Sequence, residues 1–173
     1  VADKGIPAAL FMMMTKTLLK NNISLNPADV LEKTNNTLSQ DNAAMMFVTV
    51  WLGILHIPSG KINYANAGHL YPLLKTDGNI AELNKRSGPA LGICPNYKYK
   101  LYSTCLEQNS QLLLFTDGIT DCENTKHEFF GNDRLKKRFK RTNIPDDILF
   151  AVSEFSDGAY QNDDTTILWL EHK

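Results

Sequence analysis

The stretch Leu112-Leu113-Leu114-Phe115-Thr116-Asp117-Gly118 decides how this chain is interpreted, because it joins an apolar run to an acidic turn. In a second stretch, Asn162-Asp163-Asp164-Thr165-Thr166-Ile167-Leu168-Trp169-Leu170, the acidic turn precedes the apolar run. Both runs predict short strands of a folded core. Aspartates at the mouths of neighbouring strands can meet at one point, and hard divalent cations need oxygen ligands gathered in this way. The two stretches therefore predict a metal-dependent hydrolase.

Length and composition narrow the class of protein. A chain of 173 residues that is 43% hydrophobic can bury one good core, so a single domain is expected. Lys and Arg number 18 against 19 Asp and Glu, which argues against nucleic acid as a partner. Three cysteines without CxxC spacing favour a reducing cytoplasm over a disulfide framework. The chain opens on Val1 rather than on methionine, so we expect sequence upstream of it.

Helices are expected near both ends of the chain. Pro7 fits the first turn of a helix that continues over residues 8–19. The run Met12-Met13-Met14 makes that helix apolar all round, which is typical of a helix covered on more than one side. Asn26 is suited to cap a second helix. Residues 146–155 have apolar side chains at helical spacing, which predicts a third.

The sequence between these helices predicts antiparallel strands. Residues 45–57 are apolar at both parities, as in a long strand covered on both faces. The turn Thr76-Asp77-Gly78-Asn79 is a strong hairpin signal. Further strands are expected at residues 62–65, 71–74, 80–83, 97–102, 111–115 and 165–170. Helices that bracket an antiparallel meander indicate an α+β fold built as a layered sandwich.

Seven short motifs, in this order, resemble the SpoIIE-like (RsbU-type) branch of the metal-dependent type 2C protein serine/threonine phosphatases (PPM family). They are residues 1–10, Phe47-Val48-Thr49, Tyr64-Ala65-Asn66-Ala67-Gly68-His69, Leu91-Gly92, Phe115-Thr116-Asp117-Gly118-Ile119-Thr120, Phe130-Gly131 and Asp163-Asp164-Thr165-Thr166. The resemblance implies an αββα sandwich of antiparallel sheets flanked by helices. It also implies that residues 1–173 are the C-terminal portion of one phosphatase domain that lacks its first strands.

The resemblance implies a site with two Mn²⁺ or Mg²⁺ ions. Asp117 and Asp163 would bind one ion, and the backbone carbonyl of Val1 would help to bind the other. Gly118, Asp164 and Thr166 would support this shell, and Thr165 would hydrogen-bond within the same loop. A Gly-Asp pair directly before Val1 would supply the bridging aspartate, so we expect these 173 residues alone to bind metal poorly and to turn over little substrate.

No general acid is assigned. Animal members of the wider family carry a histidine two positions after the bridging aspartate, and Ala2 stands at that position here. Asp3 and Lys4 remain candidates, although a charged pair beside a helix start is more often a capping feature. His69 is assigned to a bend rather than to catalysis. Cys122 is not expected to act as a nucleophile, because no neighbouring group lowers its pKa.

Simpler roles are available for several of these features. An Asp-Gly pair is more often a turn than a ligand, and this is expected for Asp77-Gly78 and Asp157-Gly158. The basic run at residues 136–141 is typical of a solvated helix face, although it can also attract an acidic phosphoprotein. Asp121 is expected to be a solvated carboxylate beyond the acidic turn.

Three classes of function follow. The favoured one is a signalling phosphatase that acts on phosphoserine or phosphothreonine of a regulatory protein, such as an anti-sigma-factor antagonist. The resemblance implies an upstream sensor domain, allows a homodimer, and places the domain in the cytoplasm, free or as part of a membrane-anchored sensor protein. The second class is a non-catalytic regulatory module with the same fold. The third, a two-metal nuclease, is disfavoured by the near-neutral charge.

Overall fold

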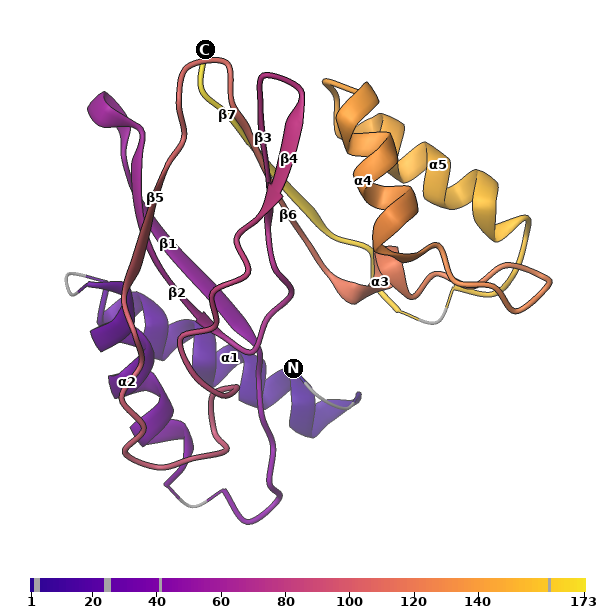
Figure 1. Cartoon of the computed structure of the whole chain (residues 1–173). Helices are drawn as coiled ribbons and strands as arrows, with labels where there is room; N and C mark the ends of the chain where they lie inside the picture. Colours follow the sequence, from indigo (N-terminus) through magenta and orange to yellow (C-terminus); the bar gives the residue numbers. More distant parts are fainter. Residues whose placement is uncertain (2–3, 24–25, 41, 162) are drawn as a thin grey trace. The chain divides into compact units, whose positions relative to one another are not determined.

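The computed structural model describes all residues except 2–3, 24–25, 41 and 162, and the chain divides into two compact units. The first unit comprises residues 1–69 and 85–105, and the second comprises residues 70–84 and 106–173. Each unit combines one antiparallel sheet with its own helices, which confirms the predicted α+β class (Figure 1). That residues 1–173 form a single domain stays a prediction.

The described residues of the first unit form two α-helices, a three-stranded sheet and one short 3₁₀ helix. The sheet has the order β1-β2-β5. Helix α2 packs on β1 and β2, and α1 packs against α2 (Figure 1). Its elements are α1 (Ile6–Asn21), α2 (Pro27–Leu38), β1 (Val50–His56), η1 (Ile57–Ser59), β2 (Lys61–Ala67) and β5 (Tyr102–Cys105).

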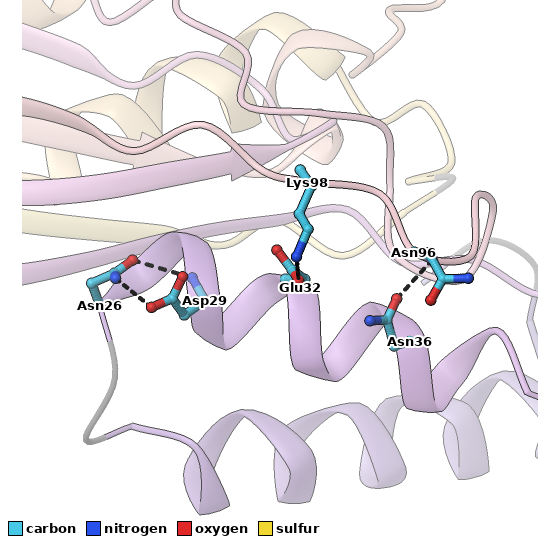
Figure 2. A network of polar contacts seen from close by, with 6 residues as sticks. All are labelled: Asn26, Asp29, Glu32, Asn36, Asn96 and Lys98. Atoms are coloured by element: carbon cyan, nitrogen blue, oxygen red, sulfur yellow. Dashed lines mark hydrogen bonds and ion pairs between the residues drawn. The ribbon is translucent and has the colours of Figure 1, made fainter.

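Helix α2 begins where the sequence predicts and ties a distant loop to itself. The Asn26 side chain accepts hydrogen bonds from the backbone N–H groups of Ala28 and Asp29, as expected of an N-cap. Further along the helix Glu32 pairs with Lys98, and the Asn36 side chain accepts from the backbone of Asn96 at 2.8 Å (Figure 2). These contacts hold the irregular segment around residue 96 on the solvent side of α2.

Three expectations about residues 12–57 of the first unit are wrong. The predicted strand over residues 45–57 begins only at Val50, because the Asn42 side chain bonds both backbone groups of Met46 and Met45 takes a left-handed φ of 50°. Strand β1 is also half-buried or exposed along its length rather than covered on both faces. Helix α1 is not covered on more than one side, because Met12, Met13 and Met14 are 51%, 58% and 43% exposed.

The segment predicted as a strand at residues 97–102 is irregular as far as Leu101. Lys100 donates its backbone N–H to Ser87 O, and the Tyr99 hydroxyl donates to Pro89 O at 3.0 Å. A side chain at Gly88 would overlap the rings of Tyr97 and Tyr99. The segment therefore packs along residues 87–89 through Tyr99, the one buried residue of 97–102, and the alternating burial expected of a strand is absent from these described residues.

In the second unit, the residues that the structure describes form a four-stranded sheet and three helices. The sheet has the order β4-β3-β6-β7, and every neighbouring pair is antiparallel. Helix α4 contacts α3, α5 and β4. Its elements are β3 (Leu73–Thr76), β4 (Asn79–Glu82), β6 (Gln111–Phe115), α3 (Asp117–Thr120), α4 (Gly131–Arg141), α5 (Asp146–Ser156) and β7 (Ile167–Glu171).

The sequence anticipates this unit well. Asp77 and Gly78, both with positive φ, form the tight hairpin between β3 and β4. Asp157 and Gly158 form the turn that ends α5, as expected of that Asp-Gly pair. The core contains the side chains of β6 and of α4 and α5, with Leu113, Leu135 and Phe139 fully buried. No helix among the described residues is long and apolar enough to span a membrane.

Candidate metal centre

The ladder between β6 and β7 brings the two acidic turns together. Phe115 pairs with Ile167 at the end of the ladder. Beyond this pair, Thr116 N donates to Thr166 O at 3.1 Å, and Thr166 N donates to the Thr116 hydroxyl at 3.0 Å. The strand that ends before Asp117 and the strand that begins after Asp163 therefore lie side by side at this edge of the sheet.

Thr116 is the residue that joins the two turns most directly. It stands at the N-cap of α3, where a threonine hydroxyl usually accepts a hydrogen bond from the helix. Here that cap bond is absent, and the hydroxyl donates to Asp164 O at 3.0 Å. Sequence reasoning assigned Thr116 no role. The available signal was a hydroxyl residue placed between the end of a predicted strand and an Asp-Gly pair.

Gly118 is required by the close approach of the second turn. A Cβ atom built on Gly118 would overlap Asp164 O, and it would lie 2.8 Å from the Asp164 carbonyl carbon and 3.2 Å from Asp163 O. The Thr165 hydroxyl donates to Gly118 O at 3.2 Å. The structure thus gives Gly118 a supporting position between the turns, through its small size rather than through a left-handed backbone.

The loop that carries Asp163 is held by its own side chains. Asp164 N donates to Asp163 Oδ1 at 2.8 Å. Gln161 Nε2 donates to Asp163 O at 2.7 Å and to the Thr165 hydroxyl at 3.3 Å. Both aspartates are exposed. Gln161 is a further residue that sequence reasoning did not single out, and only its folded position indicates its role.

The carboxylate of Asp117 faces solvent at the start of α3. Its backbone carbonyl accepts from Asp121 N at 2.7 Å and from the Thr120 hydroxyl at 3.3 Å, so the backbone is fixed. Within the part of the chain that the structure describes, the carboxylate itself has no hydrogen-bond or ion-pair partner. An exposed carboxylate on an immobilised backbone can accept a cation without unfolding its surroundings.

This donor set fits a hard divalent cation in chemistry, because it consists of carboxylate oxygens on two adjoining turns. Apart from the six residues outside the description, no group of three His, Cys, Asp or Glu side chains could hold a metal ion. Val1 belongs to the first unit, so its carbonyl as a ligand stays a prediction. Asp3, a candidate general acid, and Ala2, which stands at the position of the family's histidine, lie outside the described residues.

The other candidate side chains lie in different surroundings. The Asn66 side chain bonds both backbone groups of His69, at 2.8 and 3.0 Å, and His69 Nδ1 lies 3.2 Å from the Thr49 hydroxyl. Asn66 rather than the imidazole therefore makes the bend. Burial raises the pKa of Cys122, which keeps this thiol in its less nucleophilic neutral form.

The family model of Stage II sporulation protein E (SpoIIE) matches residues 1–173, the whole chain. The chain belongs to the SpoIIE family. Protein IcfG of Synechocystis is 28% identical over 202 aligned residues, which cover 97% of this chain and 32% of IcfG. Phosphoserine phosphatase RsbU of Bacillus subtilis is 33% identical over 141 residues, which cover 79% of this chain and 42% of RsbU. The chain spans a third to two fifths of these relatives.

Solved structures share the fold of this SpoIIE-family chain. The SiaA-PP2C domain of Pseudomonas aeruginosa matches with a TM-score of 0.84 at 22% identity, over 99% of this chain and 73% of that domain. The catalytic domain of the serine/threonine protein phosphatase PstP, solved in complex with two manganese ions, matches with a TM-score of 0.67 at 11% identity, over 93% and 80%. The predicted relationship to type 2C phosphatase domains is confirmed.

Proposed function

We propose that this domain is the catalytic part of a metal-dependent protein serine/threonine phosphatase in bacterial signalling. The observation that carries the proposal is that the two acidic turns lie beside each other. They are held there by the hydrogen bonds of Thr116 and by the close contact at Gly118. The chain that carries them belongs to the SpoIIE family. Substrate can approach these turns, because Asp117, Asp163 and Asp164 are exposed.

In this proposal Asp117 and Asp163 ligate one Mn²⁺ or Mg²⁺ ion. Asp164, Gly118 and Thr166 support them, although the described hydrogen bonds of Thr166 run through its backbone. The Val1 carbonyl would complete the shell of a second ion. The proposal applies to a chain that also carries the family's bridging aspartate. When bound, two such metal ions would lower the pKa of a shared water and neutralise charge on the phosphoryl group.

The proposed substrate is a regulatory protein phosphorylated on serine or threonine. The support is that the relative RsbU is named a phosphoserine phosphatase. An anti-sigma-factor antagonist is the type of substrate we favour, and an upstream sensor domain is the type of input. We place the protein in the cytoplasm, either free or as the cytoplasmic part of a membrane-anchored sensor, and allow a homodimer.

Calorimetric titration of Mn²⁺ tests the site in a chain that includes the upstream aspartate. Asp117→Asn and Asp163→Asn are each expected to weaken binding by about tenfold or more, because each removes a charged ligand. Asp157→Asn, in the turn after α5, is the matched control and should bind as tightly as the unchanged chain.

Hydrolysis of a phosphoserine peptide in the same preparations tests the reaction. We expect Mn²⁺-dependent release of phosphate that both ligand substitutions abolish and that the control retains. Equal Mn²⁺ affinity in all variants, together with no release of phosphate, would support the alternative function, a non-catalytic regulatory module with the phosphatase fold.

A further inference from the structure

Helix α4 is strongly basic in a chain that is otherwise acidic. It contains one acid, Asp133, and six cations, Arg134, Lys136, Lys137, Arg138, Lys140 and Arg141. Its charge is therefore +5, so the remaining residues together carry −6 against the net charge of −1 for the whole chain. Positive charge is concentrated on this one helix of the second unit.

Three of the six cations help to fix the helix in its unit. Arg134 donates to Phe129 O at 2.8 Å and stacks over the Phe155 ring at 4.7 Å. Lys136 pairs with Glu82 of β4 at 2.7 Å. Arg138 Nε donates to Asp147 O at 3.1 Å, at the start of α5. These three side chains therefore have structural roles.

The other three cations, Lys137, Lys140 and Arg141, form what we call the basic face. They lie opposite the fully buried Leu135 and Phe139, because successive helical residues are rotated by about 100°. All three are exposed, and among the described residues they have no ion pair or hydrogen-bonded carboxylate. The basic face is thus directed away from the packed side of the unit.

Helix stability accounts for only part of the basic face. Cations in the last turn interact favourably with the helix dipole, by about 0.3–1 kcal/mol each, and Arg138, Lys140 and Arg141 all lie there, whereas Lys137 does not. Like charges three and four positions apart repel by about 0.2–0.5 kcal/mol per pair. Lys137 has such a relation to both Lys140 and Arg141. An anionic partner would remove this repulsion, which is a reason to look for one.

We propose that the basic face docks an acidic surface of the phosphoprotein substrate. This proposal rests on the proposed phosphatase function. Helix α3, which begins at Asp117, packs on α4 within the same unit. In Figure 1 α3 lies beside the end of α4 where that helix begins, and Lys137, Lys140 and Arg141 lie about 9–15 Å further along α4, at 1.5 Å per residue from its first residue. The face is therefore separate from the acidic turns and suits a partner that extends over both places.

A protein substrate has the required size and charge. A phosphoseryl group carries close to two negative charges at neutral pH, and a phosphoprotein with further carboxylates extends that charge beyond the reacting group. A positive patch outside the reaction centre acts mainly on encounter rate and partner choice. A small phosphate ester is too short to contact the basic face while it is bound at the acidic turns. Docking therefore predicts a difference between large acidic and small substrates.

The test replaces all three cations by K137E, K140E and R141E in the phosphatase with its upstream residues, using phosphorylated casein and p-nitrophenyl phosphate as substrates. We expect KM for casein to rise about tenfold or more at 50 mM salt, since three attractions become repulsions. For p-nitrophenyl phosphate, kcat/KM should stay within about twofold. Raising the salt to 300 mM should reduce the difference for casein, because exposed charges are screened.

A matched control changes the net charge equally at exposed lysines elsewhere, with K33E, K61E and K126E. Its KM for casein should remain within about twofold of the unchanged enzyme. The conservative variant K137R, K140R and R141K should also retain casein binding, which separates charge from a folding defect. Thermal unfolding of all three variants checks that the domain is intact.

Equal losses on both substrates, or an equal effect of the control, would overturn the docking proposal. So would stronger binding of phosphatidylserine vesicles, RNA or a second copy of the chain to the same face. Fluorescence anisotropy with labelled phosphorylated casein measures docking without turnover. If the unchanged enzyme releases no phosphate but binds casein through the basic face, the proposed function fails and the docking surface stands.

Discussion

Two hydrogen-bonded regions, the bend at Asn66 in the first unit and the pair of acidic turns in the second, use polar side chains in opposite ways. In the first unit Asn66 is fully buried, and both ends of its side chain bond the backbone of His69. In the second unit the acidic turns are held mainly through backbone groups, Thr116 and Gly118, while Asp117 and Asp163 remain exposed. Polar side chains satisfied within the fold stabilise it, whereas side chains held in place but open to solvent are available to a ligand.

Gly118→Ala is expected to give the largest loss of stability. Alanine usually favours a helix over glycine, but here its Cβ would overlap Asp164 O. We expect the free energy of unfolding to fall by about 3 kcal/mol in urea titrations. Gly78→Ala is the control, because Gly78 has a positive φ of 74° but open space around it, and it should cost about 1 kcal/mol. A neutral Gly118→Ala would show that the two turns are not in tight contact.

Asn66→Ala should destabilise the first unit by about 2–3 kcal/mol. The substitution removes two hydrogen bonds and leaves the backbone N–H and C=O of His69 without these partners. Asn63→Ala, on the same strand and partly exposed, should cost less than about 1 kcal/mol. Chemical unfolding of the two variants gives the comparison. Similar losses would indicate that the hydrogen bonds between Asn66 and His69 are not specially stabilising.

Tyr99→Phe tests, through the pH dependence of stability, how burial of a polar group affects the first unit. Burial is the main cause that raises the pKa of Tyr99 above its ordinary value of 10, and nearby Cys94 and Tyr97 add to it. The folded state keeps the proton when the unfolded chain loses it, so stability should decline as pH rises above about 10. Tyr99→Phe should cost about 1 kcal/mol at pH 7 and make the decline shallower. An unchanged slope between pH 9.5 and 11 would contradict this.

Asp117→Asn should have the smallest effect on folding. Its carboxylate has no described partner, and the amide has nearly the same volume, so the free energy of unfolding in the absence of metal should change by less than about 0.5 kcal/mol. Under the proposed function, the same variant loses Mn²⁺ binding. Thermal melts with and without Mn²⁺ separate the two effects. A large loss of stability without metal would make Asp117 a structural residue like Asn66.

Local patterns predicted the elements that are defined by neighbouring residues. The Asn26 cap, the Asp77-Gly78 hairpin and strand β6 all appear as expected, because each depends on side chains a few positions apart. The predicted start of β1 was wrong, because the Asn42 side chain bonds the backbone of Met46 and competes with strand pairing. The prediction that α1 is covered on more than one side was wrong, because composition does not state which sides of a helix are covered. Met12 instead lines a groove of about 410 Å³ with residues of α1 and β1.

The sequence by itself determined which residues carry the chemistry and the order in which the chain presents them. It placed Asp117 after one strand and Asp163 before another, because the side-chain pattern of a strand is local. Only the tertiary structure decided that these strands are neighbours, that Thr116 joins their ends and that Gly118 must be small. Those facts depend on contacts between residues about 50 positions apart, which β6–β7 pairing creates and no short stretch of sequence contains.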